Sequence, residues 1–246
     1  MEDVQNKFYS SIARFYSEIF PYNPMQQKFV RACVGDLAEK HILDIGCATG
    51  ELAFQLAQGG AHVTGIDLNK DLLQQAVSNK KHEKLAFRLG NMLELKQDFS
   101  RHEFDAVLCF GNTLVHLDSE ELVVQMLEGA GAVLKPGGKL LIQLLNYDYI
   151  CGDAITSLPL IETDTIKFIR RYNFSKHSEL IGFQTNLEIK AEQLKVSNET
   201  PLLALKSSDL KTLLEKASFK NIHLYANFKQ DAFGGKHLPL VVSCEK

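Results

Sequence analysis

Residues 41–58 read HILDIGCATGELAFQLAQ, and this stretch decides the fold. A short apolar run ends in a bend that contains Gly46 and Gly50, and a segment with helical apolar spacing follows at once. Glycine lets a backbone turn tightly and approach a ligand where a Cβ would clash. In open α/β sheets, ligands bind beyond the carboxyl ends of the strands, where the strand order reverses. The stretch therefore predicts a ligand-binding bend, although it lacks both the G-x-G-x-x-G fingerprint and the GK[ST] of a phosphate-binding loop.

An alternation of buried strands and helices continues beyond this bend. Short apolar runs without polar alternation indicate strands buried on both faces, and the helices between them favour parallel strands with right-handed crossovers. One helix has Asp118 or Ser119 as its N-cap and the KPGG of residues 135–138 as its stop. The predicted strands are HILDIG, HVTGID, LAFRLG, FDAVLCF and KLLIQLL, and the predicted helices are ELAFQLAQ, KDLLQQAVSNK and SEELVVQMLEGAGAVLK.

Two regions depart from the alternation. Residues 1–38 carry amphipathic helices, whereas in residues 153–205 the runs IKFIRRYNF, ELIGFQTNLEIK and EQLKVS follow one another without helices, which predicts antiparallel strands. A helix, SSDLKTLLEKA, and the strands IHLYANF and LPLVVSCEK come last. We predict one α/β domain over residues 1–246: a Rossmann-like, doubly wound, mostly parallel seven-stranded sheet. An antiparallel C-terminal hairpin completes this sheet, and residues 153–205 form a small antiparallel β insertion that covers the substrate site.

Composition narrows the classes of function. The chain has 246 residues, with 27 Lys and Arg against 30 Asp and Glu and a formal net charge of -3. It shows no basic stripe of the kind that phosphate contacts favour, so a nucleic-acid partner is disfavoured. The five cysteines show no CxxC spacing, which predicts no metal site and a reduced, cytoplasmic setting. Neither a signal peptide nor an apolar run of about 20 residues is visible, so we expect no membrane association.

An acidic residue supports the interpretation of the bend as a ligand-binding site. Asp67 ends the predicted strand HVTGID, seventeen residues beyond Gly50. A carboxylate at the end of the second strand can accept hydrogen bonds from both hydroxyls of a ribose, as in dinucleotide folds. The alternative is that Asp67 caps the following helix, a task that Asn69 could perform equally well. Because both elements stand at matching offsets, we favour the ribose role.

These residues resemble motif I and the adjoining motifs of the class I S-adenosylmethionine (SAM)-dependent methyltransferases. The motif's form is acidic-x-Gly-x-Gly-x-Gly, and Ala48 replaces its middle glycine. The resemblance implies SAM as the cofactor and residues 1–38 as lid helices. It places the adenine near Asn91 and Met92, where Asn91 retains a carbonyl acceptor in place of the family's usual acidic residue. The implied cofactor-binding residues are Asp44, Gly46, Cys47, Ala48, Gly50, Asp67, Leu68, Asn91, Met92, Phe110, Gly111 and Tyr9.

Two further segments are similar to the glycine and sarcosine N-methyltransferases. They are GNTLVHL at residues 111–117 and NYDYI at residues 146–150. In that subfamily an arginine before NYDYI holds the carboxylate of the amino acid, whereas this chain has Leu145. Glycine is therefore a doubtful substrate, because a leucine cannot pair with a carboxylate. Arg170 or Arg171 could substitute, but neighbouring residues of a strand point to opposite faces, so only one of them can face the site.

The predicted catalytic residues are His116, Asn112 and Tyr147. A neutral amine acceptor must lose a proton near the site, and His116 is the candidate for handling that proton. Asn112 would contact the substrate or the methionine end of SAM, and Tyr147 would lie behind His116. The alternative for His116 is a structural hydrogen-bond partner.

The resulting prediction is a methyltransferase that acts on nitrogen or oxygen of a small molecule. An RNA- or protein-directed enzyme and a non-catalytic SAM-binding module remain alternatives, and the absence of an NPPY-type tetrapeptide after the fourth strand disfavours methylation of amino groups on bases. A small-molecule substrate is the expected partner, and a homodimer is left open.

Overall fold

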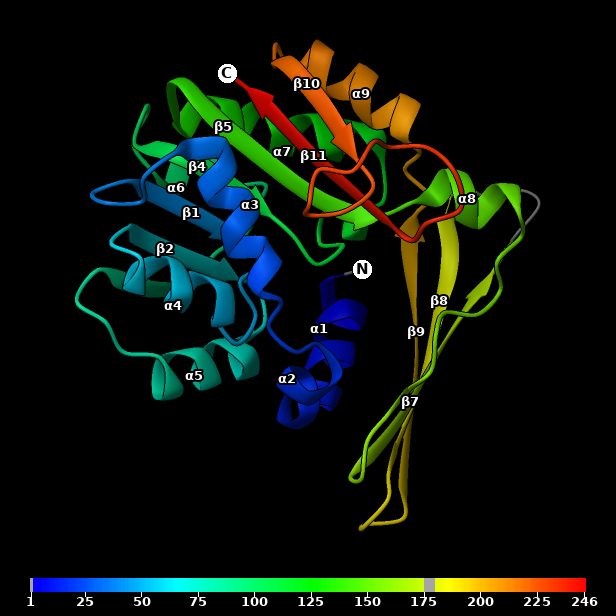
Figure 1. Ribbon diagram of the computed structural model, residues 1–246. Coiled ribbons are helices and arrows are strands. Elements are labelled where there is room, and N and C mark those ends of the chain that lie inside the picture. Colours follow the sequence, from blue (N-terminus) through cyan, green and yellow to red (C-terminus); the bar gives the residue numbers. More distant parts are fainter. Residues whose placement is uncertain (1, 175–179) are drawn as a thin grey trace.

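The computed structural model describes residues 2–174 and 180–246, and its centre is a seven-stranded sheet of order β10-β11-β5-β4-β1-β2-β3 (Figure 1). The neighbouring strands β5, β4, β1, β2 and β3 are parallel to one another, and β11 runs antiparallel to both β5 and β10. The strand order reverses between β1 and β4, which is where such sheets bind ligands. The strands are β1 (His41–Ile45), β2 (His62–Asp67), β3 (Leu85–Leu89), β4 (Phe104–Cys109), β5 (Leu134–Leu145), β10 (Lys220–Tyr225) and β11 (Pro239–Glu245).

Helices cover both faces of this sheet. One apolar core joins the strands to α6, α7 and α9, and a second joins the opposite face to α3 and α4. The predicted doubly wound fold with its C-terminal hairpin is confirmed. The helices in this domain are α3 (Pro24–Val34), α4 (Glu51–Gln58), α5 (Lys70–Asn79), α6 (Leu95–Asp98), α7 (Glu120–Val133), α8 (Tyr147–Gly152) and α9 (Ser207–Lys216).

Side-chain caps fix where the helices begin. The Asn69 side chain accepts a hydrogen bond from the Leu72 N–H and caps α5, and Ser119 caps α7 in the same way. Asp67 is therefore free of the capping role. The predicted stop of α7 is misplaced, because α7 ends at Val133 and β5 begins directly at Leu134. The buried Leu134 pairs with β4, so the KPGG turn becomes an irregular part of β5.

The β insertion forms a second, four-stranded antiparallel sheet of order β6-β7-β8-β9. Its third predicted strand was too short, because β9 continues through Pro201, a residue that an edge strand tolerates. The sheet projects from the domain as a long ribbon (Figure 1). Its strands are β6 (Ile161–Glu162), β7 (Ile166–Asn173), β8 (Leu180–Ile189) and β9 (Leu194–Leu203).

The N-terminal segment lies between the two sheets (Figure 1). It comprises α1 (Glu2–Ile12), a 3-10 turn η1 (Ala13–Phe15) and α2 (Tyr16–Ile19), so the first amphipathic stretch is interrupted and not one helix. Its apolar side packs against the inner face of the second sheet. The residue that caps α5 anchors its polar side, because the Asn69 Nδ2 atom donates to the backbone of Asn6 and to the Ser10 hydroxyl. This arrangement places α1 over the carboxyl end of β2.

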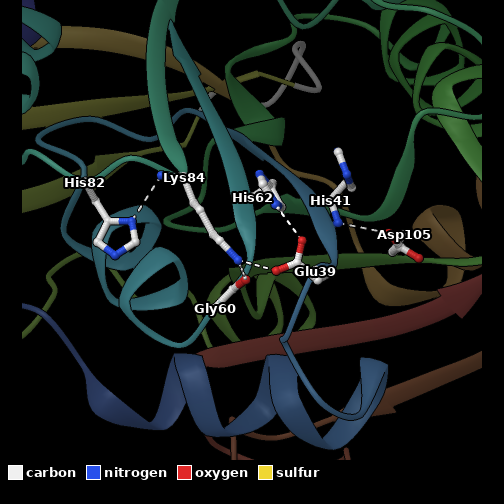
Figure 2. A network of polar contacts seen from close by, with 7 residues as sticks. All are labelled: Glu39, His41, Gly60, His62, His82, Lys84 and Asp105. Atoms are coloured by element: carbon white, nitrogen blue, oxygen red, sulfur yellow. Dashed lines mark hydrogen bonds and ion pairs between the residues drawn. The ribbon is translucent and has the colours of Figure 1, made fainter.

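A polar network lies at the opposite, amino edge of the sheet (Figure 2). Glu39 accepts hydrogen bonds from His62, at 3.0 Å, and from Lys84, while the His41 N–H donates to Asp105 Oδ2 at 2.9 Å. These contacts join the loop before β1 to the start of β2 and to the loop before β3, and they join the start of β1 to the start of β4. The histidines of this network are therefore remote from the carboxyl ends of the strands. Of the helices in the described residues, none combines the length and apolarity that crossing a membrane requires.

Candidate functional site

The glycine bend and the acidic residue of β2 are in direct contact. The N–H groups of Gly46 and Cys47 donate to the Ile66 carbonyl at 2.8 and 3.0 Å. The Ala48 N–H donates to Asp67 Oδ2 at 2.9 Å, and the Asn69 N–H donates to Asp67 Oδ1 at 2.8 Å. Burial raises the pKa of Asp67 above its usual value, and these backbone donors oppose the rise. The sequence predicted that bend and carboxylate share one edge of the sheet, and the structure places them there.

Two glycines of the bend occupy positions that only glycine fits. Gly46 has a φ of 71°, and a Cβ on it would lie 2.6 Å from the Thr113 hydroxyl oxygen. Gly50 has a φ of 76°, and its Cβ would overlap the Phe87 ring. Ala48 also adopts a left-handed conformation, with a φ of 49°, where a side chain costs about 1–2 kcal/mol. Its hydrogen bond to Asp67 compensates for part of that cost.

A pocket of about 680 Å³, its open mouth included, lies beside the bend. Asp67 supplies its polar floor, and Met92 and Phe110 supply apolar walls. The predicted site residues that line it are Tyr9, Gly46, Ala48, Asp67, Leu68, Met92, Phe110, Gly111 and His116.

A second void adjoins the first, because Tyr16, Gly46 and Phe110 line both of them. Asp44 and Cys47 line this second void. Asp44 is 4% exposed, and burial followed by the nearby Asp67 charge raises its pKa to about 7. No hydrogen-bond donor reaches the Asp44 carboxyl within residues 2–174 and 180–246. The second void therefore contains a buried acid without a partner.

The N-terminal helix closes the first pocket through a polar contact. The Tyr9 hydroxyl and His116 Nε2 are hydrogen-bonded at 2.9 Å. The other ring nitrogen, Nδ1, is inaccessible and lacks a partner in the described chain. Burial lowers the pKa of His116 to about 4, so the imidazole is neutral near pH 7. The uncharged His116 ring can therefore accept or relay a hydrogen bond.

Four predicted residues line neither void. Asn112 Nδ2 donates to the Tyr147 hydroxyl at 3.1 Å, and Asn112 Oδ1 accepts from the Leu145 N–H at 2.9 Å. The structure thus joins Asn112 to Tyr147, but behind the pocket wall. Asn91 supports a turn, with its Oδ1 accepting from the Leu93 N–H at 3.0 Å. Gly50, the fourth, begins α4.

Two residues that the sequence did not single out belong to this site. Thr113 lines the pocket and donates its hydroxyl hydrogen to the Phe110 carbonyl at 2.7 Å, which fixes it against Gly46. Asn69 lines the pocket while it caps α5 and holds α1. The available signals were the position of Thr113 within GNTLVHL and the cap at Asn69, but neither indicates a cavity on its own.

Comparisons with known proteins identify relatives for this architecture. A family model described as "Methyltransferase domain" matches residues 36–218, more than half of the chain. A protein of Geobacillus sp. (strain WCH70) named as a methyltransferase is 37% identical over 158 residues, which are 60% of this chain and 62% of that protein. A ubiquinone biosynthesis O-methyltransferase of Coxiella burnetii (strain RSA 331 / Henzerling II) is 31% identical over 172 residues, 66% of this chain and 70% of the relative. The chain thus spans less than two thirds of the first of these relatives.

Solved structures share the whole fold at low sequence identity. An S-adenosylmethionine-dependent methyltransferase from Clostridium acetobutylicum ATCC 824 has a TM-score of 0.79 at 15% identity, and the match covers 96% of this chain and 98% of that one. The amino pentose methyltransferase CalS10 from Micromonospora echinaspora, solved with SAM bound, has a TM-score of 0.66 at 16% identity, with 96% of each chain covered. At these identities the likeness establishes the fold.

Proposed function

Because the chain belongs to the methyltransferase domain family, we propose that it transfers a methyl group from SAM to a nitrogen or oxygen atom of a small molecule. One observation carries the proposal: the Gly46–Gly50 bend and the Asp67 carboxylate meet at a pocket on the carboxyl edge of the sheet. The resemblance to SAM-dependent methyltransferases predicted this family from the same two elements.

The first pocket suits an adenosyl group. The Asp67 carboxylate accepts the backbone N–H groups of Ala48 and Asn69, with Leu68 as a further backbone donor, and its remaining acceptor capacity can receive a ribose hydroxyl. Met92 and Phe110, each 6% exposed, offer apolar surfaces to the faces of an adenine. Gly46 lines the pocket without a Cβ, which lets Thr113 pack directly against the bend. The residues present therefore fit the cofactor that the family implies.

The second void suits the amino-acid end of the same cofactor. The buried Asp44 carboxyl can accept hydrogen bonds from an ammonium group. Tyr22 lines the same void, and its hydroxyl is inaccessible and has no partner in the part of the chain that the structure describes. It can donate to a carboxylate. An acid and a hydroxyl donor in one void complement a zwitterion, and we assign them to the methionine end.

The protein's tasks in the reaction are positioning and exclusion of water. SAM supplies a methyl group on a sulfonium, which is a good leaving group, so little acid or base catalysis is needed at the donor. The Tyr9–His116 hydrogen bond closes the pocket from the N-terminal side, and we assign α1 and α2 the role of a lid. A neutral His116 avoids placing a second positive charge beside the sulfonium.

Three observations support a small acceptor. The pocket is covered by α1, which leaves little room for a macromolecular substrate. The net charge of -3 does not favour a nucleic acid. The relative from Coxiella burnetii is named for ubiquinone biosynthesis and the SAM-bound structural neighbour for an amino pentose, both small molecules. Neither name decides between nitrogen and oxygen as the acceptor atom in this chain.

Calorimetric titration with S-adenosylhomocysteine tests the cofactor assignment. We expect saturable binding by the wild type and a loss of at least about tenfold in affinity for Asp67→Asn, because charged hydrogen bonds contribute about 1.5–3 kcal/mol. Asp71→Asn, which changes an exposed acid in the same region, is the matched control. Methyl transfer is then sought with labelled SAM and an extract of small metabolites. Absence of binding by the wild type would contradict the proposal.

A further inference from the structure

The inner face of the second sheet carries a band of buried polar side chains without partners. Thr185, Thr200 and Tyr172 are 1%, 3% and 2% exposed, and their hydroxyl oxygens are inaccessible. The Arg170 Nε atom is inaccessible as well. The Thr185, Thr200 and Arg170 atoms have no hydrogen-bond partner within residues 2–174 and 180–246, whereas the Tyr172 hydroxyl faces that of Tyr147. Leaving a buried polar group unsatisfied costs about 1–3 kcal/mol, so three such atoms on one face need an explanation.

The strand register makes these side chains neighbours. Arg170 of β7 pairs directly with Thr185 of β8. Tyr172 pairs with Phe183, which in turn pairs with Thr200 of β9. Residues two apart in a strand share a face, and directly opposed Cβ atoms lie about 4.5–5.5 Å apart. The polar groups therefore lie in two adjacent rows on one face, Arg170 beside Thr185 in one row and Tyr172 and Thr200 on either side of Phe183 in the next, and together they form the band.

Arg170 brings an uncompensated charge into this band. Its Nη2 donates to the Pro159 carbonyl at 2.8 Å, and no carboxylate lies within ion-pair distance of it in the described residues. The side chain is half-buried, so its inaccessible Nε–H is withdrawn from water while the rest of the guanidinium keeps partial access to it. Arg171, the next residue, lies on the outer face and is exposed, so the strand directs only Arg170 inward. A guanidinium in such surroundings is suited to bind an anion.

The band adjoins the proposed active site. β9 lies against the 3-10 turn η2 (Leu114–His116), which carries His116 with its own unpartnered Nδ1. The Tyr172 ring lies 6.4 Å from the Tyr147 ring, between their centroids. Helix α1 covers the band, because Asn198 Nδ2, in the row of Arg170 and Thr185, donates to the Ser11 hydroxyl at 3.1 Å. The same helix thus closes both the cofactor pocket and the band.

We propose that Arg170, Thr185 and Thr200 bind an anionic oxygen group, a carboxylate or a phosphate, of the methyl acceptor. This inference rests on the proposed methyl transfer, since it assigns the acceptor to the space between η2 and the second sheet. The guanidinium Nε–H and the two hydroxyls donate to the anion and gain the partners that they lack. Because the band is inaccessible while α1 covers it, the acceptor reaches it when α1 moves away.

Thermal unfolding with simple anions tests this site without knowledge of the acceptor. Wild type, Arg170→Met and Arg171→Met, each saturated with S-adenosylhomocysteine, are unfolded in sodium chloride, sodium acetate and sodium phosphate at equal ionic strength. We expect acetate or phosphate to raise the Tm of the wild type and of Arg171→Met by about 2–4 °C, and to leave Arg170→Met unchanged. The anion that acts separates a carboxylate site from a phosphate site. Should Arg170→Met fail to fold, Thr185→Val replaces it, with a diminished shift expected.

Equal shifts in all three proteins, or no shift in the wild type with either anion, would overturn the inference. The stabilisation by S-adenosylhomocysteine is measured in the same series and reports separately on the proposed function. If the wild type is stabilised by S-adenosylhomocysteine but by neither anion, the methyltransferase proposal stands and the anion site is contradicted. If S-adenosylhomocysteine does not stabilise the wild type, the methyltransferase proposal is contradicted, whatever the effect of the anions.

Discussion

The Tyr9 hydroxyl lies 2.9 Å from His116 Nε2, a contact that joins the N-terminal helix to the turn after β4 across 107 positions of sequence. The rings of the two residues also meet nearly edge to face, with centroids 5.5 Å apart. Both residues line the pocket beside Asp67. The contact therefore couples the position of α1 to the closure of the cofactor pocket.

Replacing Tyr9 with Phe is expected to loosen the N-terminal helix. The change leaves His116 Nε2 unpaired, and one neutral hydrogen bond contributes about 1 kcal/mol, which corresponds to about a fivefold change in an equilibrium. Limited proteolysis should cut α1 several times faster in Tyr9→Phe, and S-adenosylhomocysteine should protect both proteins. Tyr225→Phe, on β10 and outside both voids, is the control. Identical cleavage rates would show that this hydrogen bond does not hold α1 in place.

Substitution of Gly46 should weaken both folding and cofactor binding. Gly46→Ala should destabilise the fold for two reasons: the residue has a φ of 71°, and the new Cβ would lie 2.6 Å from the Thr113 hydroxyl oxygen. Only the first reason applies to Gly35→Ala, because Gly35 has a φ of 81° and no atom within 4 Å of its Cβ position. Chemical denaturation should show a loss of about 1 kcal/mol for Gly35→Ala and of about 1–3 kcal/mol more for Gly46→Ala. Only Gly46→Ala should lower the affinity for S-adenosylhomocysteine.

Asp44 should make cofactor binding depend on pH. Burial and the Asp67 charge raise the pKa of Asp44 to about 7, and an ammonium group binds the ionised carboxylate. Affinity for S-adenosylhomocysteine should therefore rise from about pH 6 to about pH 8 and then level off. Calorimetry on Asp44→Asn should show weaker binding without this rise. A rise of equal size in Asp44→Asn would assign the pH dependence to another group.

His116 should contribute to the pH dependence of stability. Burial lowers its pKa from 6.5 to about 4, so the unfolded chain binds more protons than the folded one between these values. Its contribution is fully present above about pH 6.5 and is lost as the pH falls towards 4, by up to about 3 kcal/mol. Asp44 has the opposite effect on the free energy of unfolding. Because its pKa is raised in the folded state, Asp44 stabilises the folded protein most at low pH, and this contribution is lost as the pH rises towards 7.

Comparison of wild type with His116→Gln isolates the first of these two effects. Urea unfolding at several pH values should show a steeper loss of stability below about pH 6.5 in the wild type than in the variant. Parallel curves for the two proteins would mean that His116 is already solvated in the folded state.

The sequence alone determined the doubly wound sheet, the place of the glycine bend and the acid at the end of β2. These are local patterns: an apolar run, a glycine where φ must be positive, and a carboxylate at a fixed offset leave few arrangements once strands are parallel. Segments without such periodicity were less predictable, as α8 and the extension of β9 through Pro201 illustrate.

Only the tertiary structure decided which side chains share a cavity. Asn112 and Tyr147 stand in a segment that suggested catalysis, yet they bond to each other behind the pocket wall. Tyr9 meets His116, and Arg170 turns inward where Arg171 turns out, because α1 and the second sheet fold over the same edge of the domain. Such contacts depend on how elements distant in sequence pack. The burial that leaves the Asp44 carboxyl and the Arg170 Nε atom without hydrogen-bond partners in the described residues arises only from that packing.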